Sequence, residues 1–325
     1  MHVVVTGAAG YVGRALAQRL SVGGSLRQGT ISKITLQDLA FAEPPTGGAR
    51  QLAGDLGHAD WLRAELGGQT MDVVFHLASI PGGSAERDYP LARRVNLEAT
   101  QTLLELGRAQ VERGGAAPVF VFASSIAVFG TMSAEVHDGT PTVPQMTYGY
   151  QKLMGELLVS DFSRRAWVDG RSVRLPGVLA RPPARTGQLS AFLSDMVRAL
   201  AAGQPFVCPM SAQARTWASS LPCVVDQLLH AAQVDGALLG ATRAVTLPTH
   251  CFAMAELVDA LGRVYGHATN DLIRYEPDAH LESLFGRFPP LTTARADHAG
   301  FLRDADMDTL ARQALAGDAV DVHHA

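Results

Sequence analysis

Strand-like and helix-like segments alternate along the first 175 residues of this 325-residue chain. Apolar, β-branched runs such as HVVVT at 2–6 and PVFVFASS at 118–125 are separated by segments such as VGRALAQRL at 12–20, whose apolar residues recur every four positions. Strands that are apolar along their whole length, separated by helices, indicate a parallel sheet covered on both faces. The sequence therefore predicts an α/β fold with a doubly wound parallel sheet.

The character of the chain changes after Leu175. The segment PGVLARPPARTGQ at 176–188 has the composition of a loop, and the helical segments that follow it have weaker periodicity. We therefore expect residues 1–175 to form the sheet domain and residues 176–325 to form mainly a smaller substrate-binding cap. Segments at about 220–250 are expected to return to the sheet domain.

Composition excludes several classes of partner. The formal net charge is -4, and no stripe of Lys and Arg with interleaved aromatics is present, so nucleic acid is not an expected partner. The longest apolar run, Val119–Phe129, contains two serines and is shorter than the ~20 residues of a membrane span. Without a signal segment, membrane span or metal-binding Cys/His spacing, we expect a cytoplasmic protein that uses no metal.

Gly7, Gly10 and Gly13 lie between the first predicted strand and the first predicted helix. Glycines at such a loop allow a tight turn and a close approach of the backbone to a pyrophosphate, which the helix N-terminus attracts. The spacing is GxxGxxG and not the usual GxGxxG, so the string alone could be a simple tight turn. Its place between a strand and a helix favours a dinucleotide site.

Two aspartates follow the next two predicted strands. Asp38 ends the second strand, where a carboxylate accepts hydrogen bonds from the adenosine ribose and repels a 2'-phosphate, which favours NAD over NADP. Asp38 could also be a solvated turn residue. Asp55 could reach the adenine amino group, or it could cap the following helix.

Tyr148 and Lys152 are four residues apart in a predicted helix, and Tyr148 follows Ser125 by 23 residues. Such a spacing occurs in every helix, so the pair gains meaning only from its context. Taken with the glycine loop, HLAS at 76–79, Asn96 and Ser125, the pair resembles the extended short-chain dehydrogenase/reductases of the NAD-dependent epimerase/dehydratase family. The resemblance covers nearly the whole chain and implies a Rossmann fold.

This resemblance also implies roles for individual residues. Tyr148 would be the acid/base, Lys152 its electrostatic partner and a ribose ligand, and Ser125 the hydroxyl that holds the substrate oxygen. Asn96 would kink its helix and relay water or protons. The further NAD contacts implied are Tyr11, Val12, Leu56, Leu77, Ala78, Asn96, Tyr148, Lys152, Pro176 and Val178.

Simple electrostatics supports the pairing. Lowering a tyrosine pKa by ~3 units requires about 4 kcal/mol, which a cation roughly 4 Å away supplies at an effective dielectric near 20. We therefore expect Lys152 to lower the pKa of Tyr148.

The segment from Arg174 to Ala232 resembles D-erythronate dehydrogenases, which implies oxidation of the C2 hydroxyl of D-erythronate to 2-dehydro-D-erythronate. An anionic sugar acid needs a cation, and Arg185 and Arg215 are the candidates; either could instead form a surface or interdomain salt bridge. Ser79 and Ser125 could hold the substrate hydroxyls.

Two other functions share most of these motifs. An NDP-sugar epimerase or dehydratase would use the same Tyr148 and Lys152, and a non-catalytic NAD(H)-binding sensor would need only the dinucleotide site. Family habit also implies a homodimer formed through helices beside the sheet, including the helix of Tyr148.

Overall fold

A computed structural model of the protein describes residues 1–22, 24–26, 29–45, 47–181 and 191–316. Its main feature is a seven-stranded sheet in the order β12-β8-β7-β6-β1-β4-β5, in which every neighbouring pair is parallel. The first strand of the chain lies inside the sheet and strands are added on both sides of it, which confirms the predicted doubly wound fold. The strands are β1 (His2–Thr6), β4 (Lys33–Asp38), β5 (Arg50–Ala53), β6 (Val73–His76), β7 (Val119–Ser125), β8 (Asp169–Leu175) and β12 (Ala244–Thr246).

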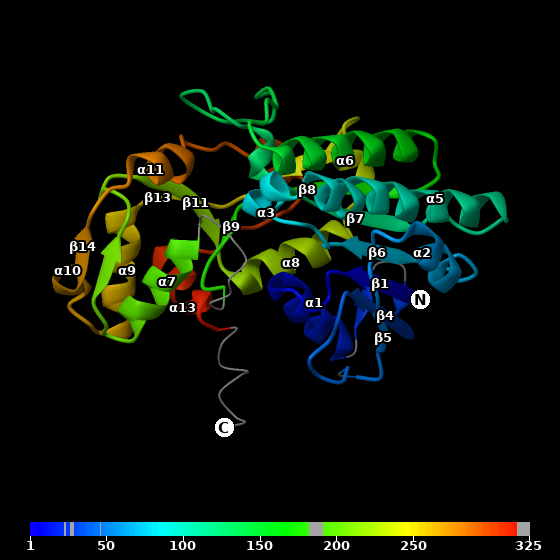
Figure 1. The fold of residues 1–325 in the computed structure, drawn as a ribbon, viewed down its shortest axis with the longest axis horizontal. Helices are drawn as coiled ribbons and strands as arrows, with labels where there is room; N and C mark the ends of the chain where they lie inside the picture. The colour runs from blue at the N-terminus through cyan, green and yellow to red at the C-terminus, as the bar shows by residue number, and fades with distance from the viewer. Residues whose placement is uncertain (23, 27–28, 46, 182–190, 317–325) are drawn as a thin grey trace.

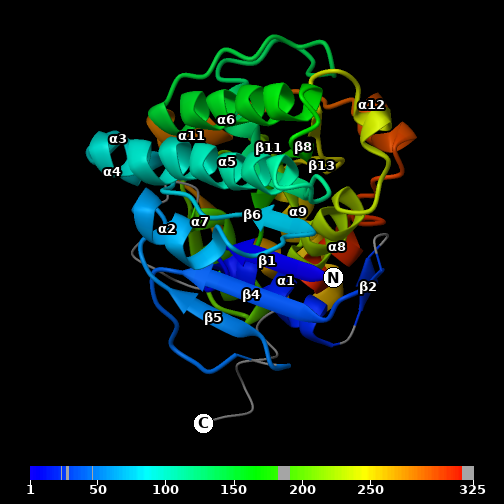
Figure 2. The ribbon, with the colours of Figure 1, turned by 90° about the vertical axis from the view of Figure 1, so that its right-hand side faces the viewer.

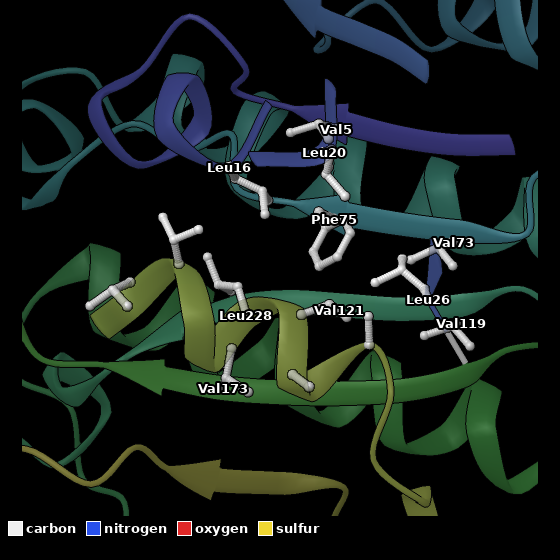
Figure 3. Packing of buried hydrophobic residues seen from close by; sticks show 14 of the residues in the cluster. Val5, Leu16, Leu20, Leu26, Val73, Phe75, Val119, Val121, Val173 and Leu228 are labelled. Atoms are coloured by element: carbon white, nitrogen blue, oxygen red, sulfur yellow. The ribbon is translucent and has the colours of Figure 1, made fainter. Parts of the chain in front are cut away.

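Helices cover both faces of this sheet, as the apolar strands require. The helices α1 (Tyr11–Ser21) and α8 (Leu221–Ala231) pack together on one face. Figure 3 shows Leu16 and Leu20 of α1 and Leu228 of α8 around Phe75 of β6, and all of these side chains are buried. Removing an aliphatic or aromatic side chain of this kind from water stabilises the fold by ~1.5–3 kcal/mol.

The opposite face carries α2 (Ala59–Leu66), α5 (Ala99–Glu112) and α6 (Thr147–Arg164), which pack on Phe120 and Phe122 of β7. Figures 1 and 2 show α5 and α6 side by side along the sheet. The helix around Asn96, which the resemblance implied to be kinked, consists of α4 (Tyr89–Ala92), a π-helical turn η1 (Arg93–Glu98) and α5.

The cap has its own core and lies on the side of the sheet domain away from the N-terminus (Figure 1). Its core contains Met196, Phe252, Leu257 and Leu310, all fully or almost fully buried. The cap elements are β9 (Gly177–Val178), α7 (Ala191–Ala201), β10 (Phe206–Cys208), β11 (Arg215–Ser219), β13 (His250–Ala253), α9 (Met254–Tyr265), α10 (Thr269–Leu272), β14 (Ile273–Tyr275), α11 (Ala279–Phe285) and α13 (Met307–Ala314).

The chain passes between the two parts more than once. The helix α8 packs on α1, and β12 pairs with β8 at the edge of the main sheet. The helix α12 (Ala294–His298) and Phe301 also join the core beneath α1 and α8. The boundary of the two domains at residue 175 stays a prediction.

The remaining short elements lie in connections. They are β2 (Ser25–Leu26), β3 (Gly29–Thr30), α3 (Gly82–Arg87), and the 3-10 turns η2 (Ile126–Val128) and η3 (Gly236–Leu239). Within the described parts of the chain, none of the helices combines the length and the apolar character needed to cross a bilayer.

Candidate active site

The glycine loop connects β1 to α1 and depends on two of its three glycines. Gly7 has φ +71°, a left-handed conformation, and a Cβ added there would lie 2.7 Å from the backbone nitrogen of Ala78. A Cβ on Gly13 would lie 2.0 Å from the carbonyl oxygen of Gly7, so only glycine lets α1 pack this closely on the loop. Gly10 is the N-cap of α1, and no side chain caps that helix. The amides at the start of α1, including those of the predicted contacts Tyr11 and Val12, are therefore available to donate hydrogen bonds to a pyrophosphate.

Asp38 is tied directly to this loop. Its Oδ2 accepts a hydrogen bond from the amide of Ala9 at 2.8 Å, and its Oδ1 accepts one from the amide of Leu39 at 2.7 Å. The carboxylate thus lies beside the glycine loop at the end of β4, where the ribose of a dinucleotide would lie. The loop, the uncapped helix and this carboxylate together fit NAD.

Asp55 shapes the turn that leads into α2. Its Oδ1 accepts a hydrogen bond from the amide of Gly57 at 2.8 Å, and its Oδ2 lies 3.4 Å from Nε2 of His58. The N-cap of α2 is His58, which makes no side-chain capping bond, so the alternative that Asp55 directly caps this helix is wrong. Leu56 is buried in the adjacent core, and the contact of Asp55 with adenine stays a prediction.

The hydroxyls of Tyr148, Ser125 and Ser79 form one hydrogen-bonded cluster. Ser125 is the last residue of β7, and its Oγ accepts a hydrogen bond from the amide of Ala127 at 3.2 Å. This bond leaves the Ser125 hydroxyl proton for Tyr148. Ser79 follows β6, the neighbouring strand, so both serines lie beyond the carboxyl ends of parallel strands, where ligands bind in such sheets.

Lys152 is buried beneath this cluster. Its Nζ donates a hydrogen bond to the carbonyl oxygen of Ala123 at 2.8 Å, and lies 5.5 Å from the ring centroid of Tyr148 and 4.9 Å from that of Phe122. Burial lowers the pKa of Lys152 to about 7, and the carboxylate of Glu156 opposes this shift.

The pKa of Tyr148 moves in the direction opposite to our expectation. Burial raises it, and hydrogen bonds from Ser125 and Ser79 together with the positive charge of Arg181 lower it without cancelling the increase. The expected net decrease of the Tyr148 pKa is therefore wrong for the protein's own groups, because burial outweighs the groups that lower it. The spacing of Tyr148 and Lys152 does not reveal two effects of burial. The low dielectric around the phenol disfavours the phenolate, and burial lowers the fraction of Lys152 that is protonated.

Asn96 lies in the π-helical turn, a feature often found at functional sites. Its Oδ1 accepts a hydrogen bond from the amide of Ile80 at 2.7 Å, and its Nδ2 donates to Ile80 O at 3.0 Å and to Oε1 of Gln151 at 2.8 Å. Asn96 thus fixes the segment after Ser79 and joins it to α6. The relay role stays a prediction.

His76 is fully buried at the end of β6. Its Nδ1 lies 2.7 Å from the Thr6 hydroxyl oxygen and its Nε2 lies 2.8 Å from that of Thr100. Burial, with a smaller contribution from the charge of Lys152, lowers the pKa of His76 to about 3. The histidine is neutral, and its partners are threonine side chains.

Arg215, one of the two arginines predicted to bind an anionic substrate, is not placed as that prediction expects. The side chain of Arg215 is 45% exposed, donates to the carbonyl oxygen of Cys251 at 3.0 Å and lies 3.9 Å from Glu256, as the salt-bridge alternative predicts. Arg185 lies outside the described residues. Arg181, which sequence reasoning missed, acts on Tyr148, and its guanidinium carbon lies 5.7 Å from the ring centroid of Tyr11.

The structure adds two further charges that the sequence did not single out. Glu156 and Arg174 form a buried ion pair beside Lys152.

Of the predicted cofactor contacts, Leu77 packs against the core next to α1, and Val178 lies in β9, directly after Pro176 and Gly177. In the described part of the chain, no group of three or more His, Cys, Asp or Glu side chains could hold a metal ion.

A hydroxyl cluster beside a buried ammonium, together with a dinucleotide loop, is the arrangement expected of an extended short-chain dehydrogenase/reductase. Comparison of the chain with known proteins gives the same class. The chain belongs to the NAD-dependent epimerase/dehydratase family, whose model matches residues 3–220. This membership confirms the predicted family and NAD as the cofactor.

Two curated relatives match nearly the whole chain. A D-erythronate dehydrogenase of Cupriavidus necator is 37% identical over 319 residues, which cover 96% of this chain and 97% of the relative. A D-erythronate dehydrogenase of Haemophilus influenzae is 32% identical and covers 98% of this chain and 100% of the relative. These relatives confirm the predicted enzyme class, an NAD-dependent dehydrogenase.

Solved structures show the same fold. A protein of Agrobacterium tumefaciens described as a nucleoside-diphosphate-sugar epimerase has a TM-score of 0.88 and 34% identity, and the match covers 97% of this chain and 94% of that one. A GalE-like L-threonine dehydrogenase of Cupriavidus necator has a TM-score of 0.82 at 21% identity, covers 97% of this chain and 99% of its own, and shows the fold alone.

Proposed function

We propose that this protein oxidises the C2 hydroxyl of a small sugar acid, D-erythronate, to 2-dehydro-D-erythronate with NAD. The observation that carries the proposal is the hydroxyl cluster of Tyr148, Ser125 and Ser79. It offers one base and two further hydroxyls to a polyhydroxy acid, and it lies above the buried Lys152. The substrate name comes from the two relatives that match over nearly their full length.

In this mechanism Tyr148, as the phenolate, takes the proton of the C2 hydroxyl. The hydroxyls of Ser125 and Ser79 hold the substrate oxygen as it becomes a carbonyl. Lys152 and Arg181 stabilise the negative charge on Tyr148. NAD bound at the glycine loop supplies the hydride acceptor.

We assign the substrate carboxylate to Arg181. Its guanidinium is close enough to Tyr148 to affect the pKa of that phenol, and it lies over the ring of Tyr11 at the start of α1. Its backbone is fixed as well, because the Arg181 amide donates to the hydroxyl of Ser194 at 3.1 Å. Arg215 is held by cap groups, and Arg185 stays a prediction from the sequence.

The test is NADH formation with D-erythronate, compared with threonate, uronates and NDP-sugars. Wild type should reduce NAD with D-erythronate, and Tyr148→Phe should lose about 1,000-fold in kcat/KM while still binding NADH. Tyr150→Phe is the matched control, because Tyr150 is half-exposed two residues further along the same helix. Turnover by Tyr148→Phe within about tenfold of wild type would exclude Tyr148 as the base.

One observation favours a second candidate, an NDP-sugar epimerase. The structural relative from Agrobacterium tumefaciens carries that description at 34% identity. Conversion of an NDP-sugar without net NADH, together with no reaction on any free acid, would establish it. Absence of both reactions, with NADH binding retained, would favour the sensor.

We also propose a cytoplasmic homodimer formed through α6. Met154 and Leu157, three residues apart on this helix, are 39% and 64% exposed. Leu157→Asp should convert a dimer to a monomer in sedimentation velocity, and an unchanged sedimentation coefficient would place the interface elsewhere.

A further inference from the structure

The carboxylate of Glu156 is buried one helical turn beyond Lys152 and has partners on both oxygens. Its Oε1 accepts hydrogen bonds from Oγ of Ser124 at 2.5 Å and from Nε of Arg174 at 2.9 Å. Its Oε2 accepts one from the second guanidinium nitrogen at 2.7 Å. The side chains of Arg174 and Glu156 are only 12% and 4% exposed, so water screens this bidentate pair weakly.

This ion pair is built into the active-site frame. Tyr148, Lys152 and Glu156 recur every four residues and share one face of α6. Ala123, which accepts the hydrogen bond of Lys152, and Ser124, which donates to Glu156, are consecutive residues at the end of β7. The ammonium and the carboxylate are therefore anchored to adjacent residues, which keeps the two charges at a fixed separation.

Other titratable or charged groups lie on the elements around Lys152 and Tyr148, but none of those named next replaces Glu156 and Arg174 in setting the charge of Lys152. From β6, His76 faces Lys152 but is neutral, because its pKa is about 3. From the π-helical turn, Arg93 pairs with Glu98 at 2.9 Å near the surface. Arg181 acts on Tyr148.

Glu156 and Arg174 carry opposite charges, so their effects on the Lys152 pKa are expected to differ in sign. The negative charge of Glu156 raises the pKa of Lys152. Arg174 extends from the end of β8, and its guanidinium carbon lies 5.1 Å from the ring centroid of Phe129. Its positive charge, fixed at the same carboxylate, offsets part of the field of Glu156 at Lys152.

We propose that the buried Glu156–Arg174 pair is a positioning device that sets the charge state of Lys152 and, through it, the pH range in which Tyr148 serves as the base. The part that concerns Tyr148 rests on the proposed function. The pair makes no contact with substrate in this role; it acts through Lys152.

The chain offers an unusually direct readout, because its only lysines are Lys33 and Lys152. Carbon-13 labelling of the lysine side chains followed by NMR titration gives two signals, and Lys33→Arg assigns them. The titration of Lys152 is then measured without substrate or turnover.

Neutralising the two partners should shift this titration in opposite directions. Glu156→Gln should lower the Lys152 pKa by about one unit, and Arg174→Gln should raise it by about one unit. The double variant should return to within about 0.3 units of wild type. A purely structural role would destabilise both single variants without producing shifts of opposite sign.

Arg171→Gln is the matched control, because Arg171 is a buried arginine three residues earlier on β8 that pairs with Asp169 at 2.8 Å. It should reduce stability and leave the Lys152 titration unchanged. Shifts of the same sign in Glu156→Gln and Arg174→Gln, or shifts below about 0.2 units in either, would overturn the proposal.

The pH profile of kcat/KM with D-erythronate completes the test. Its acid limb, which reports removal of the Tyr148 proton, should move in the direction opposite to the Lys152 titration in each variant, because a less charged Lys152 stabilises the phenolate less. If Tyr148→Phe stays active while Lys152 shifts as expected, only the assignment of the base fails. If Tyr148→Phe is inactive and Lys152 does not shift, only the role of the ion pair fails.

Discussion

Lys152→Met should make the protein more stable at neutral and acidic pH, although it should abolish turnover. Lys152 is only 2% exposed, and burial lowers its pKa from 10.5 to about 7. At 1.36 kcal/mol per pKa unit, keeping this ammonium charged in the folded protein costs roughly 5 kcal/mol. Methionine has a similar length and carries no charge.

The direction of the pH dependence follows from the pH at which the folded and the unfolded protein each release the Lys152 proton. The unfolded chain keeps the Lys152 proton up to about pH 10.5, whereas the folded protein releases it near pH 7. The free energy of unfolding of wild type therefore gains a contribution as pH rises between these values, and loses it as pH falls through about 7. Lys152→Met lacks this dependence.

Urea denaturation of both proteins at about pH 6, pH 8 and pH 10 measures the difference. The variant should be more stable by roughly 3–4 kcal/mol at pH 6, because it also loses a hydrogen bond to Ala123 worth about 1 kcal/mol. Near pH 10 this advantage should vanish. Lys33→Met, a change at an exposed lysine, is the control and should not alter the pH dependence of wild type. A difference that is the same at all three pH values would refute the reasoning.

Three further predictions concern other parts of the site. The pKa of His76 is about 3 in the folded protein, so wild type should lose about 2 kcal/mol of stability between pH 6.5 and pH 4.5, and His76→Gln should flatten this part of the urea-derived curve. Gly13→Ala, whose Cβ would lie 2.0 Å from a backbone oxygen, should raise the Kd for NADH at least about tenfold in a fluorescence titration, and more than Gly10→Ala, whose closest contact is 3.2 Å. Asp38→Ala should raise the ratio of kcat/KM for NADP to that for NAD by about tenfold or more, because it removes the charge that repels a 2'-phosphate.

The central sheet was predictable because its inner strands β1, β6 and β7 are largely apolar and each is followed by a helix. The π-helical turn at Arg93–Glu98 was not, since it depends on hydrogen bonds between Asn96 and Ile80, sixteen residues apart. The cap was predicted only in outline. Its strands are short, as in β9 (Gly177–Val178), and are held by tertiary pairing, which leaves little periodicity in the sequence.

Some parts of the site could likewise be predicted from the sequence, and others could not. Residues at the carboxyl ends of parallel strands, such as Ser125, could be placed together from the sequence because the topology brings those ends to one edge. The pairing of Glu156 with Arg174 could not, because it depends on how α6 lies across β7 and β8. Glu156 did carry a signal, since it repeats the four-residue spacing of Tyr148 and Lys152. Arg174, a charged residue near the end of the largely buried strand β8, carried another.

The buried charges of this site also give a reason for a carboxylate beside Lys152 in the proposed mechanism. Tyr148, Lys152, Arg174 and Glu156 together carry one net positive charge when Tyr148 is protonated, and none when Tyr148 is a phenolate. Because a low dielectric penalises net charge, the other three groups favour removal of the Tyr148 proton and offset part of the burial effect that raises its pKa. Without Glu156 the two cations would repel each other, and Lys152 would release its own proton instead. The carboxylate thus keeps the ammonium charged at the pH where the phenol must react.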